Sequence, residues 1–126
     1  MGEKLKEGKE LFLEHLDEIV SKESEWKFIN EQEKYKGIYI NSKWRDGIQR
    51  VTRIIFNGNY PESPPILKVT PRPKDKCFDS EGFLHWAENR QKRVWDRYKH
   101  HLNPLIYLID ELYDKYGLDI FFDLNA

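Results

Sequence analysis

The stretch Tyr60-Pro61-Glu62-Ser63-Pro64-Pro65 decides how the middle of this chain folds. Proline has a fixed φ angle and no amide hydrogen, so this stretch fits neither a helix interior nor a central strand. The residue before each proline is also driven toward extended geometry. We therefore expect a stiff turn that joins two strands, the apolar runs Val51–Phe56 and Ile66–Val69.

Side chains alternate between the two faces of a strand, so each run divides into two sets. We expect the core face to carry Thr52, Ile54, Phe56, Leu67 and Val69. The opposite face is then expected to carry Val51, Arg53, Ile55, Ile66 and Lys68. Because apolar side chains lie there beside two cations, this second face is a candidate docking surface.

A helix and two more strands are predicted before the turn. Apolar residues at helical spacing predict an amphipathic helix over residues 3–22. Strand patterns follow at residues 26–30 and 37–40, and the third strand covers residues 48–56. Short polar turns separate these strands, so we expect an antiparallel meander with Ile66–Val69 as its fourth strand.

A long flap and a final helix follow the meander. Residues 70–94 are polar and irregular, and a loop of this length inside a domain is usually functional. Asn103 is a good N-cap with Pro104 at the first helical position, and Gly117 suits the C-terminal cap. The prediction is a single α+β domain over residues 1–126, with its N- and C-terminal helices packed on a four-stranded antiparallel meander.

Composition excludes several classes of protein. The chain has 126 residues, 34% of them charged, and a net charge of −1, so it has no general basic field for nucleic acid. The single cysteine, Cys77, excludes an internal disulfide and suits a reducing compartment. No apolar run approaches the roughly 20 residues that cross a bilayer. We expect a cytoplasmic domain that reaches membranes only through partners.

The turn and its surroundings resemble the ubiquitin-conjugating enzyme family. The stretch Phe56-x-x-x-Tyr60-Pro61-x-x-Pro64-Pro65 is similar to the turn that this family has between its third and fourth strands. Gly37, Trp44, Gly47 and Trp95 also follow one another here in the family's order. The resemblance covers nearly the whole chain and implies the family's fold. The spacing from Gly37 to Tyr60 looks most like the ubiquitin-conjugating enzyme variants, the UEV proteins, and the lack of the family's one or two final helices looks more like their ESCRT type.

The catalytic positions of the family do not match. The resemblance places the acceptor cysteine three residues after Gly82, where His85 stands, and the His-Pro-Asn motif at Asp75-Lys76-Cys77. An imidazole cannot form the ubiquitin thioester, so the resemblance implies a domain without catalysis. Cys77 leaves an alternative open, because Lys74 and Lys76 could lower its thiol pKa and make it a displaced nucleophile.

Neither a metal site nor a cofactor is expected. The spacing of Cys77, His85, His100 and His101 matches neither a Cys-x-x-Cys nor a His-x₃-His pattern. A local basic cluster surrounds Trp95, and its default interpretation is a solvated loop; its members are Arg90, Lys92, Arg93, Arg97 and Lys99. A contact to RNA, to an acidic partner or to anionic lipid stays open, although the near-zero net charge argues against RNA.

The expected function is ubiquitin binding without chemistry, as in the ESCRT subunit that recognises ubiquitinated cargo. Ubiquitin or a ubiquitin-like protein is expected on the second sheet face, with Glu31 and Glu33 meeting ubiquitin's cations. Other ESCRT subunits or a catalytic conjugating enzyme are further candidate partners. Two alternatives stay open: an active conjugating enzyme that uses Cys77, and an RWD-like domain, a related fold that binds proteins other than ubiquitin.

Overall fold

The computed structural model describes residues 8–22, 25–74, 78–84, 95–96 and 99–116, with backbone alone for residues 111–116. Its elements follow the predicted order: a helix, four strands and a helix. The α+β layout with a four-stranded antiparallel sheet is therefore confirmed. The predicted start of the first helix, residues 3–7, lies outside the described part of the chain.

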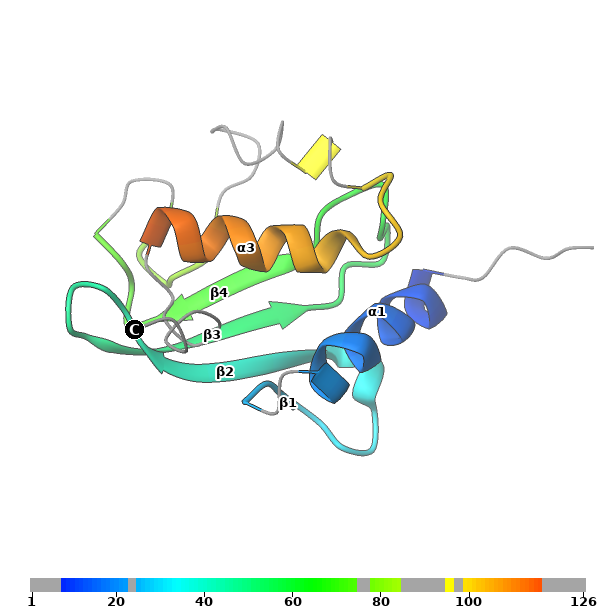
Figure 1. The fold of residues 1–126 in the computed structure, drawn as a ribbon, viewed down its shortest axis with the longest axis horizontal. Coiled ribbons are helices and arrows are strands. Elements are labelled where there is room, and N and C mark those ends of the chain that lie inside the picture. The colour runs from blue at the N-terminus through cyan, green and yellow to red at the C-terminus, as the bar shows by residue number, and fades with distance from the viewer. Residues whose placement is uncertain (1–7, 23–24, 75–77, 85–94, 97–98, 117–126) are drawn as a thin grey trace, which may run out of the picture.

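The sheet is a simple meander in the order β1-β2-β3-β4 (Figure 1). Its strands are β1 (Lys27–Phe28), β2 (Gly37–Lys43), β3 (Gln49–Ile55) and β4 (Ile66–Thr70). Every neighbouring pair is antiparallel. The first strand is shorter than predicted because the chain bends at Ile29 and Asn30, where Asn30 Oδ1 accepts the amide hydrogens of Gln32 and Glu33.

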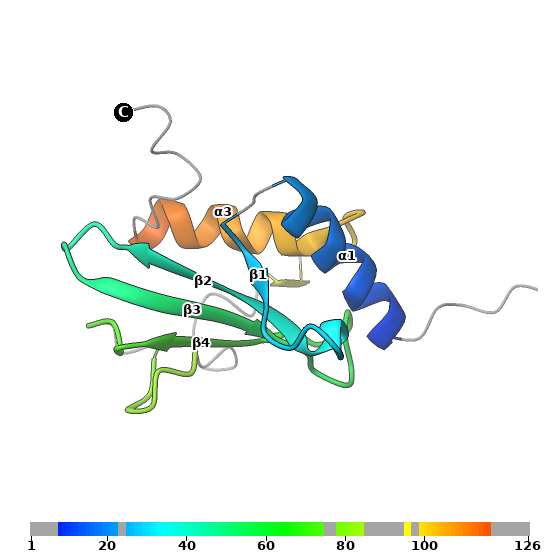
Figure 2. The same cartoon turned by 90° about the horizontal axis from the view of Figure 1, so that it is seen from below.

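Two helices lie on one side of the sheet. They are α1 (Gly8–Lys22) and α3 (Pro104–Tyr116), and Figure 2 shows both of them above the strands. A short 3₁₀ turn, η1 (Lys34–Lys36), leads into β2. Across the described ranges, no helix is long and apolar enough to span a membrane.

The core lies between these helices and one face of the sheet. Along β3 and β4, buried residues alternate with half-buried or exposed ones. Ile54 and Leu67 are cross-strand partners in the core, and Thr52 and Val69 are the next such pair. Phe56 is partly buried and packs against the same core. The predicted division of the two strands into faces is thus correct.

Tyr60 anchors the proline-rich turn to α1. Its side chain is buried, its ring meets the edge of Phe12 at 4.8 Å, and its hydroxyl lies 2.6 Å from His15 Nδ1. The indole of Trp95 donates a hydrogen bond to the carbonyl of Pro61 at 2.9 Å. The turn therefore holds α1 and the segment at Trp95 in place, as well as joining two strands.

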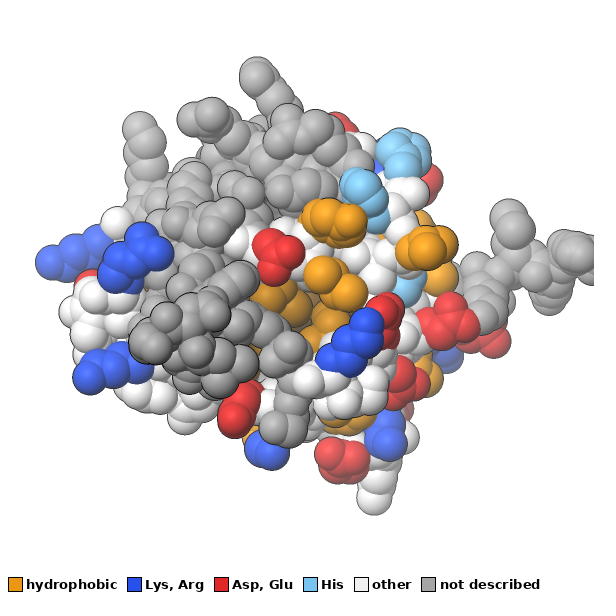
Figure 3. All heavy atoms as spheres, in the orientation of Figure 1, with side chains coloured by type: hydrophobic (Ala, Val, Ile, Leu, Met, Phe, Trp, Pro, Cys, Tyr) orange, Lys and Arg blue, Asp and Glu red, His pale blue; other side chains and the backbone are white. Residues whose placement is uncertain are grey.

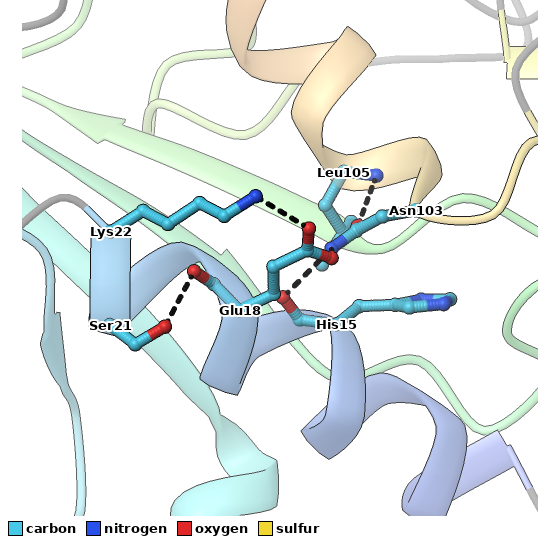
Figure 4. A network of polar contacts seen from close by, with 6 residues as sticks. All are labelled: His15, Glu18, Ser21, Lys22, Asn103 and Leu105. Atoms are coloured by element: carbon cyan, nitrogen blue, oxygen red, sulfur yellow. Dashed lines mark hydrogen bonds and ion pairs between the residues drawn. The ribbon is translucent and has the colours of Figure 1, made fainter.

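Asn103 joins the two helices at the start of α3 (Figure 4). Its Oδ1 accepts the amide hydrogen of Leu105, as predicted for an N-cap. Its Nδ2 also donates to the His15 carbonyl at 3.1 Å and to Glu18 Oε1 at 2.8 Å. The hydrogen bond from Asn103 is the main cause that lowers the pKa of Glu18. One side chain thus caps α3 and positions it against α1.

Candidate functional site

The face of the sheet that points away from the helices is the candidate site, and we call it the open face. None of the described helices lies on it (Figure 2). By strand alternation and register, its strand residues are Lys27, Tyr39, Asn41, Lys43, Gln49, Val51, Arg53, Ile55, Ile66, Lys68 and Thr70. The register fixes which of these side chains are neighbours.

The register brings the predicted docking residues together. Ile55 of β3 lies opposite Ile66 of β4, and Arg53 lies opposite Lys68. Val51 lies opposite Thr70, one step further along the same two strands. The Ile66 side chain is 38% exposed, whereas Ile55 is half-buried. All five residues predicted on strands β3 and β4 thus share one surface.

Arg53 and Lys68 are held near the middle of the open face. The Arg53 guanidinium donates a hydrogen bond to Thr70 Oγ1 at 3.1 Å. The Lys68 ammonium lies 4.9 Å above the ring of Phe83, at a distance typical of a cation–π contact. These neutral partners orient the two cations, and among the described residues no carboxylate pairs with either of them.

Glu31 and Glu33 lie apart from these cations. Both belong to the connection between β1 and β2 and are exposed. Glu33 is engaged in an ion pair of 2.7 Å with Lys36, which also raises the pKa of that lysine. This connection enters β2 at Gly37, so the two glutamates lie beyond the end of the strand and not among the cations.

The described part of the flap is a small hairpin fastened to β4. Phe78 pairs with Leu84, and Phe83 pairs with Lys68 of β4. The Arg72 guanidinium donates to the carbonyl oxygens of Phe78 and Asp79, which fixes the start of this hairpin. The hairpin therefore covers the outer edge of β4.

The two candidate nucleophile positions, Cys77 and His85, lie outside the described residues, on either side of this hairpin. Four of the five predicted basic-cluster residues also lie outside them: Arg90, Lys92, Arg93 and Arg97. The fifth residue, Lys99, pairs with Glu62 at 3.2 Å. Within the described ranges, no three histidine, cysteine, aspartate or glutamate side chains come together as a metal site.

The described surface around α3 carries several kinds of side chain, whereas Lys and Arg side chains gather at the left of the same view (Figure 3). In Figure 3 apolar, acidic and histidine side chains lie close together over the described part of α3 and its surroundings. The exposed apolar residues of this region are Leu102 and Tyr107, and the Tyr107 ring lies 4.1 Å from that of His101. Scattered residues of this kind are ordinary for a protein surface.

Several residues that shape the site were missed by sequence reasoning. Lys27 and Tyr39 join Arg53 and Lys68 on the open face only through the strand register, which no local pattern reveals. Arg50 was missed as well, although it lies on the core side of β3 and not on the open face; it is 2% exposed and pairs with Asp46. Its parity with Thr52 was a usable signal, because residues two apart in a strand share a face.

No protein-family model matches this chain, and no curated protein or solved structure matches it either.

Proposed function

We propose that this chain is a non-catalytic protein-binding domain of the UEV type, and that it takes ubiquitin or a ubiquitin-like protein on its open face. The observation that carries the proposal is the Ile55–Ile66 pair, which lies partly exposed on the open face where β3 ends and β4 begins. An antiparallel sheet with helices on one face can use its other face for a partner. In this proposal the partner is ubiquitinated cargo in an ESCRT-type sorting complex.

The absence of catalysis is part of the proposal and is supported by sequence. A ubiquitin thioester needs a thiolate, and the position three residues after Gly82 is His85. Gly82 itself lies in the described hairpin, where its carbonyl accepts the amide hydrogen of Val69 at 2.8 Å. Because Gly82 is fixed against β4, it is a defined reference point for the count of three residues that places His85 at the family's cysteine position.

The test is titration of the isotope-labelled chain with ubiquitin, followed by amide chemical shifts. We expect shifts around Ile55 and Ile66, in fast exchange, because a small interface of this kind binds weakly. Ile55→Asp should abolish binding, because it puts a carboxylate into the apolar contact, and it should leave the fold intact. Ile48→Asp is the matched control, since Ile48 is 42% exposed in the turn before β3.

The outcomes of this titration separate the proposal from its competitors. Shifts that survive Ile55→Asp would show that ubiquitin binds elsewhere. An unfolded Ile55→Asp variant would show that Ile55 belongs to the core. No response to ubiquitin or to ubiquitin-like proteins would contradict the proposed partner class.

A second candidate function is an RWD-like domain that binds a different protein. The central position of Arg53 and Lys68 favours it. Ubiquitin presents an apolar patch edged with basic residues, so like charges would face each other unless Glu31 and Glu33 meet ubiquitin's cations. A protein with carboxylates around its apolar patch needs no such compensation.

A further inference from the structure

The cations of the open face form a row that runs across the sheet. Lys27 lies opposite Tyr39, Tyr39 opposite Arg53, and Arg53 opposite Lys68. Neighbouring strands lie about 4.8 Å apart, so the backbone positions of Lys27 and Lys68 are separated by about 14 Å. We call Lys27, Tyr39, Arg53 and Lys68 the cation row.

An apolar row lies beside the cation row. The Ile29 amide donates to the Gly37 carbonyl, Gly37 lies opposite Ile55, and Ile55 lies opposite Ile66. Gly37 has no side chain, so the apolar side chains of this row are Ile29, Ile55 and Ile66. Ile29 is 41% exposed and Ile66 is 38% exposed. The two rows lie two residues apart along the strands, about 6.7 Å.

The charges of the cation row have no carboxylate partners among the described residues. The ion pairs of that part of the chain lie elsewhere, at Lys22, Lys36, Arg50 and Lys99. The strand residues of the open face include no aspartate or glutamate, and Lys43 adds a further cation beyond the row. Although the chain has a net charge of −1, the described strand residues of the open face carry only positive charges.

We propose that the open face binds an acidic amphipathic helix of a partner protein, with the apolar stripe of that helix on Ile29, Ile55 and Ile66 and its carboxylates on Lys27, Arg53 and Lys68. This inference rests on the proposed use of the open face for protein binding, and it names an acidic partner that differs from ubiquitin, whose apolar patch is edged with basic residues. Charge complementarity selects an acidic partner, because three cations lie in line and no carboxylate from the described part of the chain pairs with them.

The two parallel rows favour a helix over an extended peptide. A helix presents two neighbouring stripes of side chains, since residues three and four apart lie on one face. An extended peptide sends alternate side chains to opposite faces and offers one line of contacts. At 1.5 Å per residue, a helical segment of about nine residues spans the 14 Å row.

Single-stranded nucleic acid fits this surface less well. Such ligands stack their bases on aromatic side chains within a basic groove. The row beside the cations is made of isoleucines, and Tyr39 is the one aromatic residue among the strand residues of the open face. The observations therefore favour a protein helix over a nucleic acid.

The experiment titrates the labelled chain with a synthetic amphipathic helix that has a leucine stripe flanked by glutamates. A second peptide carries glutamine in place of every glutamate. We expect the acidic peptide to shift the amide signals of both rows and to bind at least about tenfold more tightly than the glutamine peptide. The affinity of the acidic peptide should fall as salt is added, because salt screens the charges.

Charge variants test where the peptide binds. The double variant Arg53→Gln with Lys68→Gln should bind the acidic peptide about tenfold more weakly than the parent chain does, and its affinity for the glutamine peptide should be unchanged. The matched control is Lys22→Gln with Arg45→Gln, which removes the same charge from α1 and from the β2–β3 turn. Both double variants should unfold at the same urea concentration as the parent chain, because all four side chains lie at the surface or partly exposed.

Four results would overturn this inference, and they differ in whether they also contradict the proposed function. Equal affinity for the two peptides, with ubiquitin bound at the same face, would sink the acidic helix and keep the proposed function. No binding of either peptide or of ubiquitin would sink both. If a single-stranded RNA oligonucleotide bound more tightly than the acidic peptide, the ligand of the open face would be a nucleic acid and not a protein helix. Sedimentation showing that the open face pairs two copies of this chain would replace it by self-association.

Discussion

At the scale of single residues, Tyr60 does more than its place in the proline-rich turn indicates. Its ring packs on Phe12 of α1 and lies 5.8 Å from the ring of Trp95. Its hydroxyl and His15 Nδ1 form a buried hydrogen bond that joins the turn to α1. Burial also raises the pKa of the Tyr60 hydroxyl well above its ordinary 10.0, so the group stays protonated in the folded chain.

Tyr60→Phe should lower the free energy of unfolding by about 1–2 kcal/mol, because it removes a buried hydrogen bond and keeps the ring contacts. Urea unfolding at neutral pH measures this loss. Tyr35→Phe is the control, since its ring packs on Phe56 at 5.9 Å and no hydrogen bond of its hydroxyl occurs among the described residues. If the two substitutions lowered the free energy of unfolding equally, the hydrogen bond between Tyr60 and His15 would contribute nothing to stability.

The same variant should show a pH dependence of defined sign. Above pH 10.0 the unfolded chain loses the Tyr60 proton, whereas burial keeps that proton in place in the folded chain. The stabilisation linked to Tyr60 is therefore complete below pH 10.0 and declines as the pH rises above it, by at most about 1.4 kcal/mol per pH unit. The stability gap between the parent chain and Tyr60→Phe should thus narrow in alkaline solution. A gap that stays constant there would mean that the hydroxyl is not buried.

At the scale of elements, the flap hairpin depends on a close backbone approach at Gly82. Its φ angle is +92°, and a Cβ atom there would lie 2.1 Å from the carbonyl oxygen of Val69. Gly47 has a similar φ of +86° but nothing within 4 Å of such an atom. The two glycines therefore separate backbone strain from steric contact.

Gly82→Ala should cost about 2–4 kcal/mol of stability, and Gly47→Ala only about 1 kcal/mol. Both substitutions place an alanine at a positive φ angle, which is strained, but only the Cβ atom at residue 82 also collides with β4 and pushes the hairpin away from it. Thermal or urea unfolding gives the two values. The flap would not be fastened to β4 as described if Gly82→Ala were no worse than Gly47→Ala.

Most of the elements could be predicted from sequence, because their signals are local. The turn at residues 60–65, the cap at Asn103 and the alternation along β3 each follow from the chemistry of neighbouring residues. The cation row could not be predicted, since it needs the register of all four strands. Lys27 and Lys68 are far apart in sequence, and only the pairings through Tyr39 and Arg53 place them in one line.

At the scale of the whole molecule, net charge conceals an uneven distribution. The open face carries the cation row, whereas α1 has exposed carboxylates at Glu10, Glu14 and Asp17. Buried Arg50 adds no charge to either surface, because Asp46 pairs with it at 2.9 Å and Pro71 accepts its Nε hydrogen. A net charge of −1 argued against nucleic acid, but it could not indicate which surface suits an acidic partner.

The whole chain should form no thioester when it is incubated with ubiquitin, an activating enzyme and ATP. The reason follows from the proposed resemblance to the conjugating enzymes, which puts His85 at the nucleophile position and Asp75-Lys76-Cys77 at the positions of the oxyanion-supporting motif. Non-reducing electrophoresis with and without dithiothreitol reads out the adduct, and a catalytic conjugating enzyme is the positive control. Cys77→Ser is the matched variant and should bind partners as the parent chain does. An adduct that dithiothreitol releases from the parent chain, and that Cys77→Ser never forms, would make this protein an enzyme with a displaced cysteine and would refute the non-catalytic proposal.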